Sequence, residues 1–197
     1  MAEPLSLGFD TSAAHCAAAL LQGDRVLVQR HEEMARGQAE RLMPLLIELL
    51  DEAGQGWRDL AVIGCGTGPG NFTGIRIAVA AARGLALSLS IPAIGVSLTE
   101  AAAHGLPRPC RVAVPLRMGE VIWQDFAPDP QSLPQQAPAL DLPPGPRPLP
   151  PAMPLAEAIA RIALLRRTQP GQPRPAPIYL RPADAAPARD RGPVMLS

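Results

Sequence analysis

Alternating apolar and polar positions near the start of the chain predict strands. Three such runs are present, at residues 5–9, 17–21 and 26–30. Gly23 and Asp24 lie between the second and third runs, and a Gly-Asp pair in this position is typical of a tight hairpin. We therefore expect the chain to open with three antiparallel strands.

Apolar residues then recur with a helical period over residues 37–53. At 100° per residue they cover an arc of about 200°, which is wider than packing on a single surface requires. Leu45 and Ile47 lie at the two flanks of this arc. The pattern predicts a helix that is buried on more than one side.

A second helix is predicted over residues 73–90, after a short apolar strand at residues 60–65. Arg76 and Arg83 are its only charges and lie about 20° apart on the helix. Nearly all other positions are apolar or small, so this helix is also expected to be buried on several sides. Two arginines inside the apolar stretch would be costly at a bilayer centre, so we expect no membrane contact.

A strand at residues 93–96 and a short helix at residues 98–104 complete this part of the chain. Three antiparallel strands followed by helix–strand crossovers are typical of the ribonuclease-H-like lobe of the actin, sugar-kinase and Hsp70 ATPase superfamily. We therefore predict an α/β fold of this type and assign residues 1–106 to its N-terminal lobe.

Proline marks a second region, residues 107–197, which we predict to be a reduced second lobe. Only four of the 25 prolines lie before residue 107, namely Pro4, Pro44, Pro69 and Pro92. Residues 111–115 and 121–126 have the pattern of a strand pair. Residues 127–154 are rich in proline and show no period, which predicts an extended surface chain.

Three elements are predicted beyond this proline-rich stretch. Residues 155–167 form a short amphipathic helix, and residues 178–181 form a last strand or docking segment. The tail from residue 182 is expected to be loose.

Composition excludes several kinds of chemistry. All 18 basic residues are arginine, so no lysine is available for a Schiff base, a phosphate-binding loop or general-base catalysis. The formal net charge is zero, so the chain has no overall electrostatic footprint for nucleic acid, and any role with tRNA is expected to be indirect. The first residues lack a basic stretch followed by an apolar one, which predicts a cytoplasmic protein.

Cysteine and histidine give no sign of a metal site. The three cysteines are widely spaced without a C-x-x-C pair, and we expect buried, reduced thiols. The three histidines form no pair at helical spacing. We therefore expect that this chain itself requires no metal and no cofactor.

Two short motifs could form a vestigial nucleotide site. Asp10, Thr11 and Ser12 end the first strand, where they could lie beside a phosphate or Mg²⁺, or could instead cap a turn. A glycine-rich stretch that contains Gly68 and Gly70 precedes the second helix. Its N–H groups could bind an anion at the helix N-terminus, or its glycines could let the helix pack tightly. The residues alone leave both alternatives open.

The TsaB (YeaZ) family has a characteristic motif that residues 66–77 closely resemble, with the sequence Gly-Thr-Gly-Pro-Gly-Asn-Phe-Thr-Gly-Ile-Arg-Ile. Shorter stretches also resemble family patterns, at residues 10–12, 41–44, 83–86, 94–97, 117–121 and 177–181. Asn71 stands where the family usually has Ser, and Pro115 and Leu116 stand where it usually has Asp-Ala.

This resemblance implies a non-catalytic scaffold subunit for the threonylcarbamoyl modification of adenosine next to the tRNA anticodon. It implies a fold similar to that of TsaD, the catalytic relative, without the metal-binding histidines of TsaD. The expected partners are TsaD, in a heterodimer, and the ATPase TsaE, with ATP and metal bound by these partner subunits. TsaC would supply threonylcarbamoyl-adenylate, and the isolated chain would form a self-dimer.

The resemblance also places the partner interface on the first two helices, in agreement with their wide apolar arcs. The sequence leaves open which flank of each helix points outward. The candidate interface residues are Leu42, Leu45, Ile47, Leu49, Ile75, Arg76, Val79, Ala82, Arg83 and Ala86. The alternative functions are an autonomous ATP-dependent kinase or ATPase of the same superfamily, and a metalloprotease.

Overall fold

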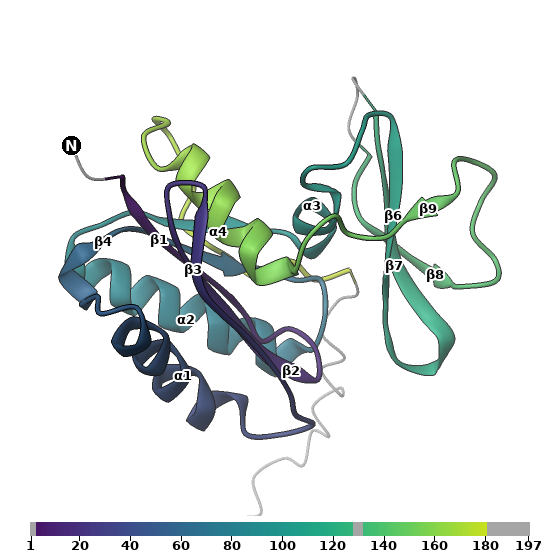
Figure 1. Ribbon diagram of the computed structural model, residues 1–197. Coiled ribbons are helices and arrows are strands. Elements are labelled where there is room, and N and C mark those ends of the chain that lie inside the picture. Colours follow the sequence, from purple (N-terminus) through teal and green to yellow (C-terminus); the bar gives the residue numbers. More distant parts are fainter. Residues whose placement is uncertain (1–2, 128–131, 181–197) are drawn as a thin grey trace, which may run out of the picture.

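The computed structural model of the chain describes residues 3–127 and 132–180 and contains two sheets (Figure 1). The larger sheet has the strand order β3-β2-β1-β4-β5. Its strands are β1 (Leu5–Asp10), β2 (His15–Gln22), β3 (Arg25–Glu33), β4 (Leu60–Gly66) and β5 (Ala93–Val96). The first three are antiparallel, whereas β4 pairs with β1 and β5 pairs with β4 in parallel. The predicted α/β fold with a ribonuclease-H-like first lobe is confirmed.

Helices cover both faces of this sheet (Figure 1). On one face lie α1 (Gln38–Glu52) and α2 (Phe72–Leu89), whose apolar side chains form the largest core cluster together with β1 and β4. A short turn of 3-10 helix, Trp57–Asp59, leads from α1 into β4. On the other face lies α4 (Leu155–Arg166).

The position of α4 differs from the predicted division of the chain, which placed residues 155–167 in the second lobe. The helix packs instead on β1, β4 and β2 of the first sheet. Its backbone comes so close that a Cβ added to Gly8 of β1 would lie 2.4 Å from the carbonyl oxygen of Ala156. Small residues on both sides allow this approach, and the sheet is therefore buried on both faces.

The second sheet has the order β8-β7-β6-β9 and packs against α3 (Leu98–Ala103). The strands β6 (Cys110–Pro115) and β7 (Glu120–Phe126) form the predicted antiparallel pair. A 3-10 turn, Arg117–Gly119, connects them, and Met118 at its tip has a positive φ of 61°.

The prediction that residues 127–154 form only an extended surface chain was wrong in part. Within them, β8 (Gln135–Pro138) pairs with β7, and β9 (Pro148–Leu149) pairs with β6. Arg111 holds the stretch between these two strands, because its Nη1 donates to the carbonyl oxygen of Pro143 at 2.6 Å. The same guanidinium binds Asp125 through two hydrogen bonds of 2.6 and 2.7 Å.

The packing of α1 predicts a sharp contrast between two adjacent residues. Leu46 is fully buried, whereas the neighbouring side chain of Ile47 is 43% exposed. We expect Leu46→Ala to lower the free energy of unfolding by about 2–5 kcal/mol, because it removes buried methyl groups and leaves a cavity. The matched control Ile47→Ala should cost about 1 kcal/mol or less. Urea unfolding followed by circular dichroism measures both, and equal losses would contradict this assignment of the buried face.

Candidate functional site

The glycine-rich loop between β4 and α2 lies directly against the turn that follows β1. A Cβ added to Gly66 would come within 2.0 Å of the Asp10 carboxylate. One added to Gly70 would lie 2.4 Å from the carbonyl oxygen of Ser12. No side chain fits at either position, so the glycines here serve close packing.

The third contact of this kind ties the first turn of α2 to the same place. A Cβ on Gly74 would lie 1.9 Å from the backbone oxygen of Thr11, whose hydroxyl donates to the Gly74 carbonyl at 2.6 Å. Asn71 caps the helix, because its side chain accepts a hydrogen bond of 3.0 Å from the Gly74 N–H. Asn is as good an N-cap as Ser, which explains why it is tolerated where the TsaB motif usually has Ser.

The polar side chains of the turn after β1 form hydrogen bonds within the chain. Asp10 is completely buried, and its Oδ2 accepts hydrogen bonds from the backbone N–H and the hydroxyl of Ser12. The same oxygen lies 2.7 Å from Nε2 of His15. Oδ1 of Asp10, which faces Gly66, has no hydrogen-bond partner in the described part of the chain.

The structure therefore brings together the predicted nucleotide-site residues. A pocket of about 450 Å³ lies beside them; its lining includes Ser12, Gly70, Asn71 and the acidic Glu120, with no basic residue among its described residues. The turn and the glycine loop touch at Gly66, Gly70 and Gly74. Gly68 has a positive φ of 86° and packs against Ile75 instead of facing the turn. Of the two alternatives left open by the sequence, the capped turn and the tight packing agree with this geometry.

The C-terminal segment, residues 173–180, docks next to this loop. The N–H of Ile178 donates to the carbonyl oxygen of Thr67 at 2.8 Å. Tyr179 accepts a hydrogen bond of 2.9 Å from Nε of Arg76, whose guanidinium lies 3.7 Å from the centre of the Phe72 ring. The predicted docking of residues 178–180 is thus confirmed, whereas Arg181 and the tail that follows lie outside the described residues.

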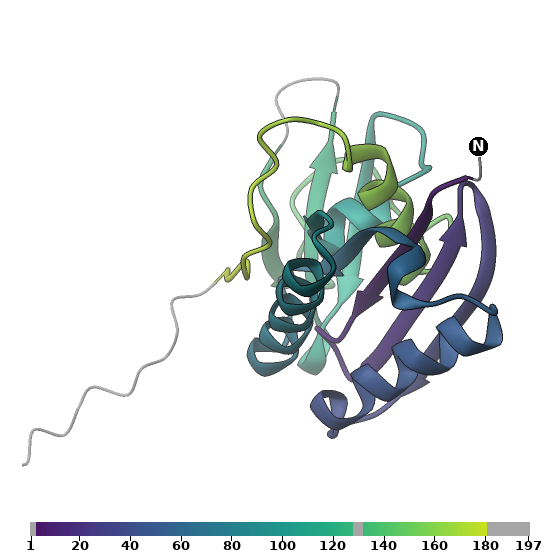
Figure 2. The ribbon, with the colours of Figure 1, turned by 90° about the vertical axis from the view of Figure 1, so that its left-hand side faces the viewer.

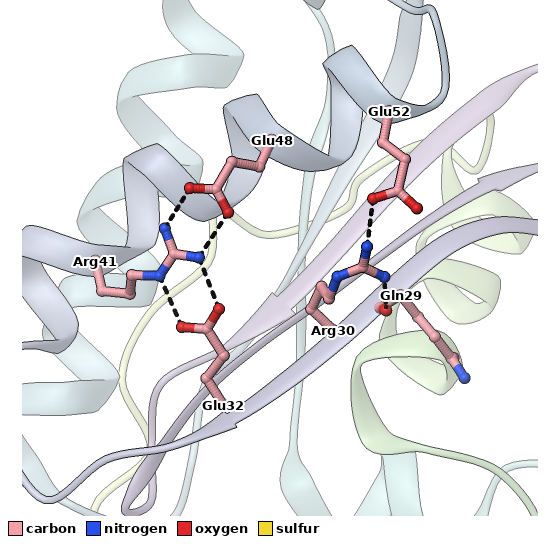
Figure 3. A network of polar contacts seen from close by, with 6 residues as sticks. All are labelled: Gln29, Arg30, Glu32, Arg41, Glu48 and Glu52. Atoms are coloured by element: carbon pink, nitrogen blue, oxygen red, sulfur yellow. Dashed lines mark hydrogen bonds and ion pairs between the residues drawn. The ribbon is translucent and has the colours of Figure 1, made fainter.

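On the opposite side of α2 lies α1, which is joined to β3 by ion pairs (Figure 3). Arg41 of α1 binds Glu32 of β3 through bonds of 2.7 and 2.6 Å, and binds Glu48 through two bonds of 2.6 Å. A second pair joins Arg30 to Glu52. The hydrogen bonds from Arg41 lower the pKa of both Glu32 and Glu48 below that of a free glutamate.

Most of the predicted interface residues are buried in the chain's own core. The burial fixes which faces of the two helices point inward, and it corrects the prediction for Leu42, Leu45, Leu49, Ile75, Val79, Ala82 and Ala86. A side chain that packs on its own sheet cannot also contact a partner. Ile47, Arg76 and Arg83 remain on the surface.

The outward surface of α1 and α2 forms what we call the helix face, made of exposed Ile47, Ala80, Gly84 and Leu87 with half-buried Met43 and Ile77. Helical spacing puts Met43 and Ile47 on the side of α1 away from Arg41, which is the side toward α2. Leu87 is 83% exposed. The sequence left open which flank of α2 points outward, and the structure places Ile77 and Gly84 on that flank, opposite the buried Ile75 and Val79.

By length and composition alone, α2 could cross a membrane, although the sequence predicted no membrane contact. Its buried side, however, packs on β4 and β1 of the chain's own sheet. Arg76 and Arg83 lie on its exposed side. This arrangement is that of a helix on one face of an α/β sheet.

The three cysteines are free and buried, as predicted. Burial raises the pKa of Cys16 to about 11 and that of Cys65 to about 12, so both stay protonated near neutral pH. Among residues 3–127 and 132–180, no three His, Cys, Asp or Glu side chains lie close enough together to hold a metal ion.

Comparisons with known proteins agree on one family. The model of a family described as TsaD, tRNA N6-adenosine threonylcarbamoyltransferase, matches residues 29–132, just over half of the chain. The tRNA threonylcarbamoyladenosine biosynthesis protein TsaB of Escherichia coli is 36% identical over 128 residues, which are 62% of this chain and 55% of that protein. The TsaB protein of Bacillus subtilis is 38% identical over 100 residues, 50% and 44% of the two chains. The chain thus spans about half the length of these curated relatives.

Other relatives match over most of their length. An uncharacterized protein of Mycobacterium tuberculosis is 32% identical over 184 residues, which cover 84% of this chain and 82% of that protein. The solved structure of YeaZ from Pseudomonas aeruginosa superposes with a TM-score of 0.73 at 27% identity. It covers 90% of this chain and all of the YeaZ chain.

The glycine packing predicts opposite effects for two substitutions on the same helix. We expect Gly74→Ala to lower the free energy of unfolding by about 2 kcal/mol or more, because the new Cβ collides with backbone that must move. At Gly84 a Cβ would meet nothing within 4 Å, so Gly84→Ala should raise stability by about 0.5–1 kcal/mol through helix propensity. Thermal unfolding tests the pair, and a stable Gly74→Ala variant would contradict the packing described here.

The Arg41 ion pairs predict a dependence of stability on pH. Because the folded-state pKa values of Glu32 and Glu48 are lowered, these pairs stabilise the fold above the unfolded pKa of about 4.3. The contribution is lost as pH falls through the lowered values. The difference in urea midpoint between the wild type and Arg41→Met should therefore be larger at pH 7 than at pH 3.

The same difference should shrink in high salt, since these side chains are partly exposed. Arg36→Met is a suitable control, because Arg36 is exposed and has no ion pair within the described ranges. A difference for Arg41→Met that stays constant between pH 7 and pH 3 would show that packing, and not charge, is responsible.

Proposed function

Because this chain belongs to the TsaB (YeaZ) family, we propose that it is a non-catalytic partner subunit for the threonylcarbamoyl modification of tRNA adenosine. In this proposal it acts in the cytoplasm, binds TsaD and supports the transfer that TsaD carries out, with TsaE joining the pair. Its contact with tRNA is indirect. The names of the relatives favour this role over a kinase or a metalloprotease.

One observation carries the non-catalytic part of the proposal. In an ATP-dependent enzyme of this fold, a phosphate would need room beside the turn that follows β1 and the loop that precedes α2. Here the pocket beside that turn is lined by the acidic Glu120 and by no basic residue among its described residues, and Thr11 and Ser12 use their hydroxyl groups in hydrogen bonds within the chain. This geometry supports a subunit that contributes a binding surface and not a catalytic site.

The helix face supports the partner part of the proposal. It combines a large exposed side chain, Leu87, with the small residues Ala80 and Gly84, which allow the backbone of another helix to approach closely. Ion pairs of Arg41 and Arg30 join α1 to β3, and the buried sides of both helices pack on the sheet. An apolar surface of this kind suits a helical partner.

Charge also suits self-association of the isolated chain through the same face. Glu40 and Asp51 are the charged residues of α1 without an ion pair in the described part of the chain, whereas the charged residues of α2 are Arg76 and Arg83. In a two-fold pair, α1 of one copy lies against α2 of the other, so acidic and basic helices would meet. The self-dimer and the TsaD heterodimer would therefore exclude one another.

Two substitutions on the helix face test the proposal. We expect Ile47→Glu and Ala80→Glu to stay folded, because both positions are exposed, and to weaken binding to TsaD about a hundredfold. A carboxylate buried without a partner in an interface costs several kcal/mol, and about 1.4 kcal/mol corresponds to a tenfold change. Calorimetric titration with TsaD from the same organism measures the affinity.

Leu165→Glu is the matched control, since Leu165 is 66% exposed on α4, on the other side of the sheet. It should bind TsaD as the wild type does. Threonylcarbamoyl-adenosine should form only in mixtures that contain TsaD, and less of it with the two helix-face variants. Product formed by this chain alone from threonylcarbamoyl-adenylate and tRNA, or full TsaD affinity in both variants, would refute the proposal.

A further inference from the structure

A groove of about 500 Å³ lies at the C-terminal end of α2, between this helix and the C-terminal segment. Figure 2 shows that segment, in yellow-green, running past α2 on the side away from α1. We call the depression the arginine groove; it is lined by Arg83, Gly84, Ala86, Leu87, Ser90, Ile91, Ala93, Arg174 and Pro175. Helix and segment are about ninety residues apart in sequence, and each contributes one arginine.

In the part of the chain that the structure describes, the side chains of the two arginines are not bonded to other groups. Within the described residues, Arg83 and Arg174 make no ion pair and no hydrogen bond, and no acidic residue lines the groove. Some other arginines are bonded to carboxylates, as the side chains of Arg41, Arg111 and Arg166 show, whereas Arg36 is exposed without an ion pair in the described residues. Two free guanidinium groups that flank one depression favour a ligand with negative charge, because a guanidinium binds a carboxylate through two parallel hydrogen bonds.

The rest of the lining is mainly apolar. Leu87 is 83% exposed here, beside Ala86, Ile91 and Pro175. A ligand that carried only charge would leave this surface in water, whereas one with a large aliphatic group next to its charge would cover it. The groove has room for a few side chains of such a ligand.

We propose that the arginine groove binds a segment of a partner protein that carries a carboxylate next to a large aliphatic side chain. Nucleic acid fits less well, because no aromatic ring that could stack on a base lines the groove and the chain has no net positive charge. Residues 181–197 of the chain itself also fit less well, since they contain three arginines and two aspartates.

The inference stands on the chemistry of the groove itself. The groove borders the helix face and shares Gly84 and Leu87 with it, so a partner on that face could extend into it. The groove proposal does not require that this partner be TsaD, and the test below contains no TsaD. Failure of the groove proposal would leave the partner-subunit proposal in place, and the reverse also holds.

The test uses the full chain labelled with ¹⁵N and a defined peptide, acetyl-Ala-Glu-Leu-Glu-Leu-Ala-amide, at millimolar concentration. We expect saturable shifts of the Nε–H resonances of Arg83 and Arg174 in the NMR spectrum. The same peptide with Gln in place of Glu should bind at least fivefold more weakly. Arg83→Gln and Arg174→Gln should each weaken binding of the acidic peptide about tenfold, because each removes a charge-assisted pair.

Arg36→Gln is the control, since Arg36 is an exposed arginine outside the groove without an ion pair in the parts of the chain that the structure describes. It should leave the peptide affinity unchanged. Three results would overturn the proposal: no saturable shift with the acidic peptide, equal affinity for the Glu and Gln peptides, or tighter binding of a uridylate dodecamer at the same two arginines.

Discussion

Gly66, Gly70 and Gly74 bring the loop before α2 into contact with the turn after β1, and the remaining architecture depends on this contact. Each glycine meets a different residue of the turn, and none of the three positions has room for a side chain. The Thr11 hydroxyl adds a hydrogen bond to the first turn of α2. The direction of α2 is therefore fixed at its N-terminus, and so is the surface that this helix presents to solvent.

The same contact bears on the proposal that this chain is a non-catalytic subunit. A loop of glycines in front of a helix binds phosphate when its N–H groups face open space. Here the glycines pack against the turn, and the pocket beside them is lined by Glu120 and by no basic residue among its described residues. The C-terminal segment covers the loop from the other side through Ile178 and Tyr179. Residues that could serve nucleotide chemistry are used instead to hold β1, β4 and α2 together, while Ile47 and Leu87 are exposed apolar side chains on α1 and α2.

The order of the elements could be predicted from the sequence because it depends on local periodicity. The strands, α1, α2 and the turn between β2 and β3 all follow from apolar spacing and turn residues within a few positions. The pairing of β8 and β9 could not be predicted, because it depends on partners in β7 and β6 and on the reach of Arg111 to Pro143. Proline removes donors from a strand, but at the edge of a sheet this loss costs little.

The outward flank of each helix was the other question that periodicity could not answer. A helix that is apolar nearly all round does not show which side packs on its own sheet. The sequence therefore could not distinguish the side with Val79 from the side with Ile77, whereas the structure shows that Val79 is the buried one. Charged and polar contacts distinguish the two sides of each helix in the structure. Arg41 and Arg30 draw one flank of α1 onto β3, and Tyr179 draws Arg76 toward the C-terminal segment. These contacts use Arg41 and Arg76 within the chain, whereas Arg83 has no partner among the described residues. The apolar surface with Ile47, Ala80 and Gly84 lies between the two charged flanks.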